Sequence, residues 1–402
     1  MTKVARLFYR FAGIHSLLIG LLPFFIPVLL WQQGYQLTEV SAFIALTAVG
    51  FMIGLIGWKA LYDQRQWRTI LLGSFVAELA LVVSLILITL LTESSVIVFV
   101  LTALLNGIYN CFYWITQRTL FSAMTQVKTG KQADNKTGKK FGNFQIVIVI
   151  FLKIGILIGG YFLAQQQTLW LLVISTLLSV AAYFSLCRQV TYSESQLTPI
   201  NKTAVIDYRQ KVVFTIDGVF LFCESYFWVL TLFFITDNNV MDLGLLVVGL
   251  TITLSIIFWG IKNTIDKLNQ GYVFYSATLL YALSWIIRGS VNSHTDSYIL
   301  LVSIIIIAFL TTFFRLSFNK QFFDDANSQQ PLAFIIMKSY LSQRGLIVFF
   351  ALLSLSLLMM GESDNSLALL YWCLAPIAVL YGMYPLRHQT HLQSELNNEQ
   401  NY

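Results

Sequence analysis

Charged side chains occur inside long apolar stretches of this 402-residue chain, where a charge has few natural partners. Lys153 lies in the run IVIVIFLKIGILIGG, and Asp217 and Glu224 lie in VVFTIDGVFLFCESYFWVL. The two carboxylates are seven positions apart, so on a helix they would share one face about two turns from each other. A charge in a bilayer is costly unless it is paired, which makes each of these residues a functional candidate.

Two kinds of chemistry follow from these residue types. A lysine ammonium near the membrane midplane could bind the anionic group of a solute. A carboxylate in a low-dielectric cavity can take up and release a proton near neutral pH, and a histidine such as His15 can relay one. We therefore predict that Lys153 binds substrate and that proton-coupling roles fall to His15, Asp217 and Glu224. The alternative is a set of permanent ties, such as a salt bridge of Lys153 with Glu78 or Glu224, or a histidine hydrogen-bonded between helices.

A polar stripe follows one face of the expected helix at residues 95–117. Its members recur at i, i+4, i+7 and i+11 and are Asn106, Asn110, Tyr113 and Gln117. A polar face on a lipid-embedded helix should look inward, toward water or substrate. Aromatic residues could supply walls for an organic solute, and an amphipathic segment, IIMKSYLSQRGL, could carry its arginine well inside the protein. The predicted substrate-binding residues are Asn106, Asn110, Tyr113, Lys153, Trp228 and Arg344.

Composition makes the bilayer the solvent for most of the chain. Hydrophobic residues account for 57% of the sequence and charged residues for 11%, against about 25% charged in soluble domains. Apolar runs long enough to cross a bilayer predict an all-α polytopic membrane protein with twelve transmembrane helices. The predicted spans are about 8–31, 40–58, 69–92, 95–117, 143–164, 168–187, 212–236, 244–261, 272–288, 298–316, 333–361 and 367–386.

The first charged turn has a copy about half a chain length further on. GWKALYDQRQWR, from Gly57 to Arg68, and GIKNTIDK, from Gly260 to Lys267, share the spacing Gly-x-Lys-x-x-x-Asp between two apolar runs. A turn and flanking helices that recur at half length predict two parallel, pseudo-symmetric repeats of about six helices. The predicted domains are a six-helix bundle at 1–187, a cytoplasmic linker at 188–211, a second six-helix bundle at 212–386 and a polar cytoplasmic tail at 387–402.

Positive charge alternates between successive loops. Lysine and arginine crowd the N-terminal segment, the turn before Arg68 and the loop around 128–140, whereas the loops at 32–39, 92–95 and 165–168 contain none. This is the positive-inside pattern, and it places both termini in the cytoplasm of a cell, with the inner membrane of a bacterium as the expected location. The formal net charge of +6 then reflects topology, and we expect no nucleic-acid partner.

Motifs for catalysis and metal binding do not occur in the sequence. It contains no GxxxxGK[ST] loop, no HExxH and no GxSxG. The four cysteines lie within or at the end of apolar runs, without a CxxC or a Cys/His pair, so neither a disulfide framework nor a metal site is expected. The chain is therefore predicted not to be an enzyme, to need no cofactor and not to use ATP by itself.

Twelve spans in two halves, a basic central loop and a charged turn after the second span of each half resemble the major facilitator superfamily of secondary transporters. The turn pattern of that family is Gly-x-x-x-Asp-Arg-x-Gly-Arg-Arg, and here Asp63 matches the aspartate and Arg68 the last arginine. Its glycines and first arginine are replaced by Lys59, Gln66 and Gln64. The resemblance implies that both turns clamp the domains in the outward-facing state, which predicts gating roles for Asp63, Arg68, Asp266 and Lys267.

The resemblance also implies which helices line the transport path. In that family these are helices one, four, seven and ten, with five and eleven beside them. The favoured lining residues are then His15, the Asn106 stripe, Lys153, Glu224 and Arg344. Glu78 would lie on the third helix, which is usually peripheral, and this favours a structural tie. Members of that family usually act as monomers, so the resemblance implies a monomer.

These features together predict a proton-coupled secondary transporter that moves a small organic, in the leading interpretation anionic, solute by alternating access. One alternative is an exporter of lipophilic or secreted small molecules, such as drugs or siderophores. From another class, the chain could be a non-transporting membrane receptor or scaffold, although buried charges argue against that role. The sequence does not distinguish import from export.

Overall fold

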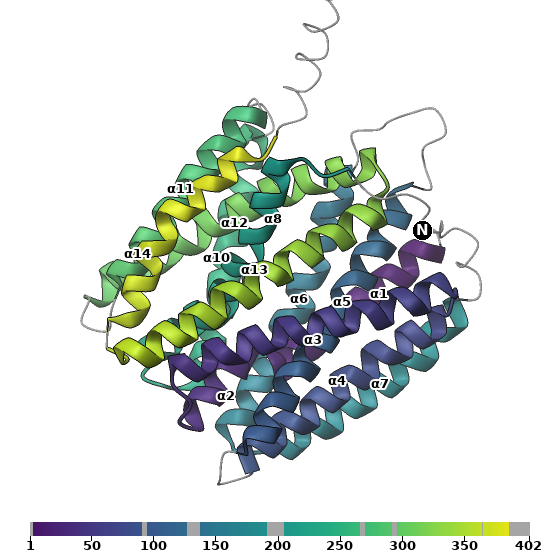
Figure 1. Ribbon diagram of the computed structural model, residues 1–402, viewed down its shortest axis with the longest axis horizontal. Coiled ribbons are helices and arrows are strands. Elements are labelled where there is room, and N and C mark those ends of the chain that lie inside the picture. Colours follow the sequence, from purple (N-terminus) through teal and green to yellow (C-terminus); the bar gives the residue numbers. More distant parts are fainter. Residues whose placement is uncertain are drawn as a thin grey trace, which may run out of the picture. The chain divides into compact units, whose positions relative to one another are not determined.

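The computed structural model describes residues 3–90, 95–126, 137–190, 205–265, 270–291, 296–363 and 365–385, and all regular elements in these ranges are helical (Figure 1). The N-terminal elements are α1 (Lys3–Leu21), η1 (Pro23–Phe25), α2 (Ile26–Gln32), α3 (Leu37–Asp63), α4 (Trp67–Leu90), α5 (Val96–Gln126), α6 (Thr137–Ala164) and α7 (Thr168–Val190). The C-terminal elements are α8 (Tyr208–Phe222), η3 (Cys223–Phe227), α9 (Trp228–Ile235), α10 (Val240–Ile265), α11 (Gln270–Ser290), α12 (Ser297–Ser328), α13 (Pro331–Met360), α14 (Ser366–Ala378) and η4 (Val379–Met383).

Each of the twelve expected spans corresponds in order to one helix or to one helical series. Ten helices in the described ranges are long and apolar enough to cross a membrane, and the pair Ala5–Leu21 and Pro23–Gln32 makes an eleventh. The remaining span is α11, a helix of 21 residues that includes Arg288 and several serine, glycine and tyrosine residues. Its length suits a bilayer crossing, although it is less apolar than the other eleven.

Within the described residues, two of the spans are interrupted along their length, and the twelfth ends in the 3-10 helix η4. The first bends by 45° between α1 and η1, where Pro23 and Pro27 each remove a backbone donor from the helical ladder. The seventh contains a π-helical turn, η3, between α8 and α9. Such turns place an extra residue in the helix and are frequent at functional sites. This one contains Glu224, a residue with a predicted role.

The described residues pack as two units. The first comprises 1–204, 215–248 and 330–362, and the second comprises 205–214, 249–329 and 363–402. Within the first unit α13 lies along α3, and α4 lies beside α7 (Figure 1). Within the second, α11 packs against α12 and α14. The division into sequence halves at 187 and 212 is a different partition and stays a prediction.

Glycines bring helices of the first unit into direct backbone contact. A Cβ on Gly155 or Gly159 of α6 would overlap the carbonyl oxygens of Leu17 and Leu21 in α1. A Cβ on Gly107 of α5 would likewise overlap the backbone of α3. The small residues of α6 therefore serve close helix packing. The α3–α5 contact likewise holds the backbone around Gly107 in place.

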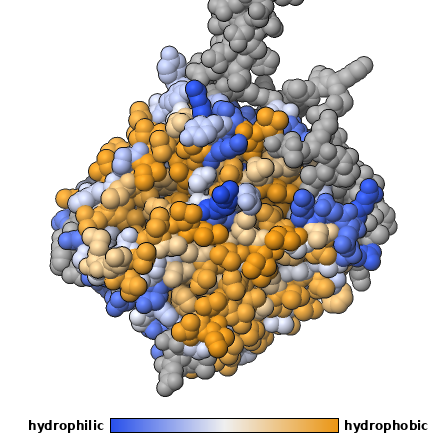
Figure 2. Space-filling view, in the orientation of Figure 1, coloured by the Kyte–Doolittle hydropathy of each residue, from blue (hydrophilic) through white to orange (hydrophobic). Residues whose placement is uncertain are grey.

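Large apolar side chains are exposed along most of these helices. Examples are Ile56, Leu177, Ile256 and Leu358, each more than half exposed. Figure 2 shows one face on which hydrophobic residues predominate. In water such a surface would favour aggregation, whereas in a bilayer it contacts lipid chains at little cost.

Candidate functional site

The polar stripe on α5 forms a hydrogen-bonded network that reaches the π-helical turn. The Nδ2 group of Asn106, which is 3% exposed, donates to the Tyr226 hydroxyl at 2.8 Å and to Thr47 Oγ1 of α3 at 3.2 Å. Asn110 Nδ2 donates to the Asn106 carbonyl oxygen at 2.8 Å and to its Oδ1 at 3.0 Å. Trp114 Nε1 donates to Asn110 Oδ1 at 3.2 Å. The spacing therefore predicted the shared face correctly, and η3 supplies a partner that spacing alone does not reveal.

This network has an engaged end and an accessible end. Asn106 and Tyr226 are buried, and their bond joins α5 to η3. Asn110 and Trp114 are only half-buried. Asn110 uses its amide donors on Asn106, so a polar solute would bind the remaining lone pair of Asn110 Oδ1 or displace one of these bonds, with the Trp114 indole beside it. This end could bind a polar organic solute.

The other half of the stripe ties α5 to α1. Tyr113 is 1% exposed, and its hydroxyl accepts a hydrogen bond from Gln117 Nε2 at 2.8 Å. The Ser16 hydroxyl donates to the Ala12 carbonyl at 2.6 Å, which leaves its oxygen to accept from the Tyr113 hydroxyl at 3.4 Å. In this conformation the phenol of Tyr113, a predicted substrate ligand, is thus engaged in a helix contact.

His15 is fully buried between α1, α4 and α5, and both of its ring nitrogens have partners. Ser74 Oγ donates to the Leu71 carbonyl at 2.8 Å, so its oxygen accepts from His15 Nε2 at 3.1 Å. The Tyr109 hydroxyl lies 3.4 Å from Nδ1 and can donate to it. Phe75 stacks on the imidazole at 4.5 Å. These contacts suit a neutral imidazole with its proton on Nε2, and they agree with the alternative of a histidine held between helices.

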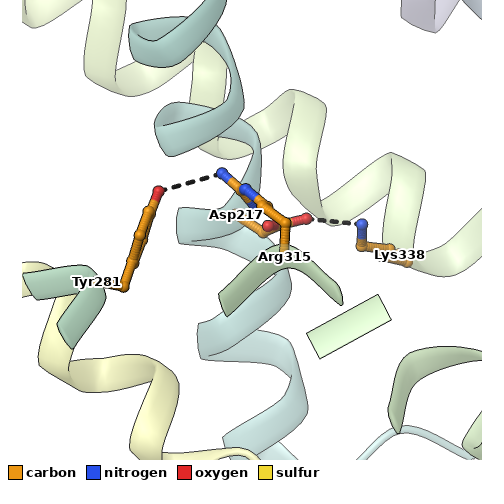
Figure 3. Close-up of polar contacts among 4 residues, drawn as sticks. All are labelled: Asp217, Tyr281, Arg315 and Lys338. Atoms are coloured by element: carbon orange, nitrogen blue, oxygen red, sulfur yellow. Dashed lines mark hydrogen bonds and ion pairs between the residues drawn. The ribbon is translucent and has the colours of Figure 1, made fainter. Parts of the chain in front are cut away.

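Asp217 pairs with a lysine of α13. Its Oδ2 lies 2.6 Å from Lys338 Nζ, and both residues are buried (Figure 3). The helices meet closely here, because a Cβ on Gly218 would crowd Ser342 of α13 and one on Gly345 would overlap Thr215 of α8. Asp217 thus forms a salt bridge between two helices, and the sequence analysis did not identify Lys338 as its partner. Removing one partner of a buried pair is costly because it leaves a buried charge behind.

Glu224 and Trp228 lie two positions before and after Tyr226, the residue that accepts the hydrogen bond from Asn106. Glu224 is half-buried in η3, and Trp228, the first residue of α9, is 8% exposed. Because residues two apart on a helix do not face each other, the Glu224 and Trp228 side chains leave the helix on a different side from Tyr226.

The two cations predicted to bind an anion have different surroundings. Lys153 is half-buried in α6, and none of the side chains described in the structure forms a hydrogen bond or ion pair with its ammonium. Arg344 is exposed on α13, where its guanidinium lies 5.6 Å from the ring centroid of Tyr340. A salt bridge of Lys153 with Glu78 or Glu224, which the sequence left open, is not formed between these described residues.

Comparisons with known proteins bear on the fold. The sequence matches no family model and no curated protein. Among solved structures, the chain is similar to a mutant of the nucleoside transporter NupG, with a TM-score of 0.61 over 95% of this chain and 100% of that chain, at 11% sequence identity. The chain has the major facilitator fold. The expected fold is thereby confirmed, and with it a multi-pass integral membrane protein.

Two arginines of the second unit lie on helices for which the sequence analysis named no candidate residue. Arg288 of α11 is buried, donates to Ser284 Oγ at 2.9 Å and Thr311 Oγ1 at 2.7 Å, and lies 4.4 Å from the Trp285 ring centroid. Arg315 of α12, the tenth span, donates to the Tyr281 hydroxyl at 3.2 Å (Figure 3). Arg288 is the last residue of its predicted span and Arg315 the second-last of its own, so a search for charges well inside apolar runs did not find them.

The charged turn between α3 and α4 is exposed at its predicted gating residues. Asp63 ends α3 and Arg68 is the second residue of α4, and both side chains are exposed. Between them Arg65 has a left-handed backbone with φ of 58°. Tyr62 stacks on the buried Trp58 at 5.0 Å and holds the turn to its own helix. Asp266 and Lys267, the second predicted gate, lie outside the described residues.

Proposed function

We propose that the chain is a secondary active transporter that moves a small organic solute across the bacterial inner membrane by alternating access, as a monomer. The observation that carries this proposal is the hydrogen-bond network of Asn106, Asn110 and Tyr226 in a major facilitator fold. It joins a helix of the predicted first half to the π-helical turn of the predicted second half. A solute bound to this network would change its surroundings whenever the halves rearrange.

The solute that we favour is an organic anion. The ammonium of Lys153 has no partner among the described side chains, so a carboxylate or phosphate on the solute would supply a counter-charge. The accessible amide of Asn110 and the indole of Trp114 would bind the uncharged part of the same molecule. Binding of this kind needs both a charge and a polar ring or chain on the solute.

An uncharged polar solute is the second candidate. The amide–indole pair of Asn110 and Trp114 suits a heteroaromatic ring without any help from Lys153. The similarity in fold to a nucleoside transporter points to the same class of molecule. A lipophilic compound exporter is a third candidate, for which neither Lys153 nor the amides would matter.

Proton coupling falls to Glu224 in this proposal. Glu224 is half-buried in the turn that also carries Tyr226, so its protonation would act on the network through the backbone of that turn. A proton taken up there would cross the membrane with, or in exchange for, the solute.

Thermal stabilisation of the purified protein by organic anions, nucleosides and lipophilic compounds tests the solute class. A ligand that binds the folded state raises its apparent stability with occupancy. We expect organic anions to stabilise the wild type, Lys153→Ala to lose that response, and the matched control Lys59→Ala, at an exposed lysine of α3, to keep it. If nucleosides stabilise the wild type and Lys153→Ala but not Asn110→Ala, the solute is uncharged and the anion proposal is wrong. A response to lipophilic compounds alone would favour the exporter.

Transport into sealed proteoliposomes tests the coupling. With an imposed proton gradient, the wild type should accumulate the stabilising solute. Glu224→Gln should still exchange internal for external solute but should lose accumulation driven by the gradient, because only net transport requires the proton to leave its site. Accumulation by Glu224→Gln equal to that of the wild type would remove this residue from coupling. A protein with no flux for any stabilising solute would be a receptor or scaffold.

The orientation is part of the proposal. Positive loops on one side place both termini in the cytoplasm. A fluorescent protein that matures only in the cytoplasm, fused after Tyr402, should become fluorescent. If the full-length fusion is expressed without fluorescence, the C-terminus lies outside the cytoplasm and the proposed orientation is wrong.

A further inference from the structure

A buried carboxylate between α4 and α7 has one oxygen without a hydrogen-bonding partner. Glu78 of α4 has no exposed surface, and its Oε2 accepts a hydrogen bond from Ser179 Oγ of α7 at 2.8 Å. Its Oε1 has no partner in the structure as described. The hydroxyl of Ser175, one helical turn before Ser179, is also buried and also lacks a partner. Two orphan polar atoms thus occur on helices that pack side by side (Figure 1).

The side chains that face Glu78 do not neutralise an ionised carboxylate. From α5, the hydroxyl of Tyr109 lies near Glu78, but a tyrosine carries no positive charge that could neutralise it. From α1, His15 reaches Ser74, one turn from Glu78 on α4, and its two nitrogens are engaged with Ser74 and Tyr109. Among the described residues no ion pair to Glu78 is formed. An ionised carboxylate in such a place is strongly disfavoured.

One proton would satisfy both orphan atoms. A carboxylic acid has an O–H donor that the carboxylate lacks, and the Ser175 hydroxyl, which lies within interaction range of the Glu78 carboxyl group, can accept from it. Oε2 would keep the hydrogen bond that it accepts from Ser179. A metal cation would need more: one carboxylate and two hydroxyls give fewer oxygens than the six or more that Ca²⁺ takes. No cluster of three acidic, cysteine or histidine side chains occurs in the described ranges either.

We propose that Glu78 is a proton-binding site, occupied in this conformation, in which the carboxylic acid bridges the Ser175 and Ser179 hydroxyls. Binding adds one proton to one carboxylate oxygen and changes no other bond. Because Glu78 is sealed from solvent, its proton can leave only when α4 and α7 separate or water enters between them. This site is separate from Glu224, and the inference does not depend on the proposed transport activity.

Infrared spectroscopy of the purified protein at neutral pH tests the protonation state, because a carboxylic acid and a carboxylate absorb at different frequencies. We expect a carbonyl band of a protonated carboxylic acid in the wild type that is missing from Glu78→Gln and kept in Glu224→Gln. The amide of Glu78→Gln can donate to Ser175 and accept from Ser179, so this variant should fold with nearly unchanged thermal stability. A wild-type spectrum without any acid band that depends on Glu78 would overturn the proposal.

A second variant keeps the test decisive even where Glu78→Gln does not fold. Ser175→Ala removes the acceptor of the proposed O–H bond but leaves the carboxyl group in place. The acid band should persist but shift, because the acid O–H loses its acceptor while Oε2 keeps the bond from Ser179. The control Ser84→Ala, elsewhere on α4, should not shift it. An acid band unchanged by Ser175→Ala would exclude the bridge. The wild type and Glu78→Gln are also compared in Na⁺ and in choline at constant ionic strength. If Na⁺ stabilises only the wild type, the site binds a metal cation and the proton proposal is wrong.

Discussion

The two ends of α3 are held in different ways. At its N-terminal end, the backbone amides of Leu37 and Thr38 donate to the Glu362 carboxylate at 3.0 and 2.6 Å, and the Thr38 hydroxyl donates to it at 2.6 Å. At its C-terminal end, Asp63 is exposed and the chain turns back directly into α4. Sequence reasoning placed the gate at the second end, whereas the stronger tie in this conformation is at the first.

The tie at the first end depends on a residue far away in the chain. Glu362 is 325 positions from Leu37 and follows directly after α13, where Gly361 has a φ of 79° that lets the chain leave the helix. Helix N-termini carry unsatisfied amides and a partial positive charge, so a carboxylate there is stabilising. The comparison teaches that a charged residue in a loop of this fold is better judged by the helix end it can reach than by its match to a sequence pattern.

The largest effect expected at these two ends is that of Glu362→Ala. Removal of the carboxylate leaves two amides and a hydroxyl of α3 to water and should lower the free energy of unfolding by about 1–2 kcal/mol, a value reduced by partial exposure. The measurement is thermal unfolding of the purified protein in detergent. Glu39→Ala, which removes only the bond to the Gln36 amide in the same turn, is the control and should have a smaller effect. Equal loss in both variants would mean that the long-range tie adds nothing.

A smaller effect is expected for Ser354→Ala. The Ser354 hydroxyl of α13 donates to the Thr38 carbonyl at 2.9 Å, a second link at the same end of α3. Loss of one neutral hydrogen bond should cost about 1 kcal/mol. The double variant with Glu362→Ala should show a coupling between the two sites, because both contact Thr38. Strictly additive losses would show that the two links act independently.

At the other end, Asp63→Asn should change the unfolding free energy by less than about 0.5 kcal/mol, as is usual for exposed residues. Transport is the informative readout for this variant. A drop in the initial rate of solute uptake without loss of stability would support the predicted gating role in another conformation. A variant that is much less stable would show instead that Asp63 already holds the turn in this one.

The smallest effect is expected for Arg65→Gly, and it has the opposite sign. Arg65 has a left-handed backbone, which costs an L-residue about 1–2 kcal/mol relative to glycine, partly offset by the larger entropy of glycine in the unfolded chain. We expect a gain of up to about 0.5 kcal/mol in thermal unfolding experiments. The control Arg65→Ala should give no gain, because alanine keeps the Cβ. A gain in both variants would point to charge rather than backbone strain.

The fold could be predicted from the sequence because the bilayer imposes a simple rule on it. Apolar runs bounded by charged turns marked each span, and the structure has a helix or helical series at each. The extent of α5 was underestimated: the expected span ended at 117, but the helix continues to Gln126. Polar residues beyond the membrane can prolong a helix without any apolar signal. The π-helical turn at Cys223–Phe227 likewise has no sequence signature.

The candidate site could be predicted only where local spacing decides it. Asn106 and Asn110 share a face because they are four residues apart, and the structure joins them. The partners of Asp217 and of the α3 N-terminus, Lys338 and Glu362, are more than a hundred positions away from them. Spacing within one helix carries no information about such contacts, since the packing of different helices determines them.

The glycine contacts of α1 with α6 and of α3 with α5 also have a mechanical meaning. Where two backbones touch, no side chain lies between them that could change rotamer or yield under load, so the pair is stiff at that point. A force applied to α1 would be transmitted directly to α6, and a force on α3 to α5. Each pair therefore acts as a single lever in any rearrangement of this unit, and elastic deformation would concentrate at the bend before Pro23 and in the π-helical turn.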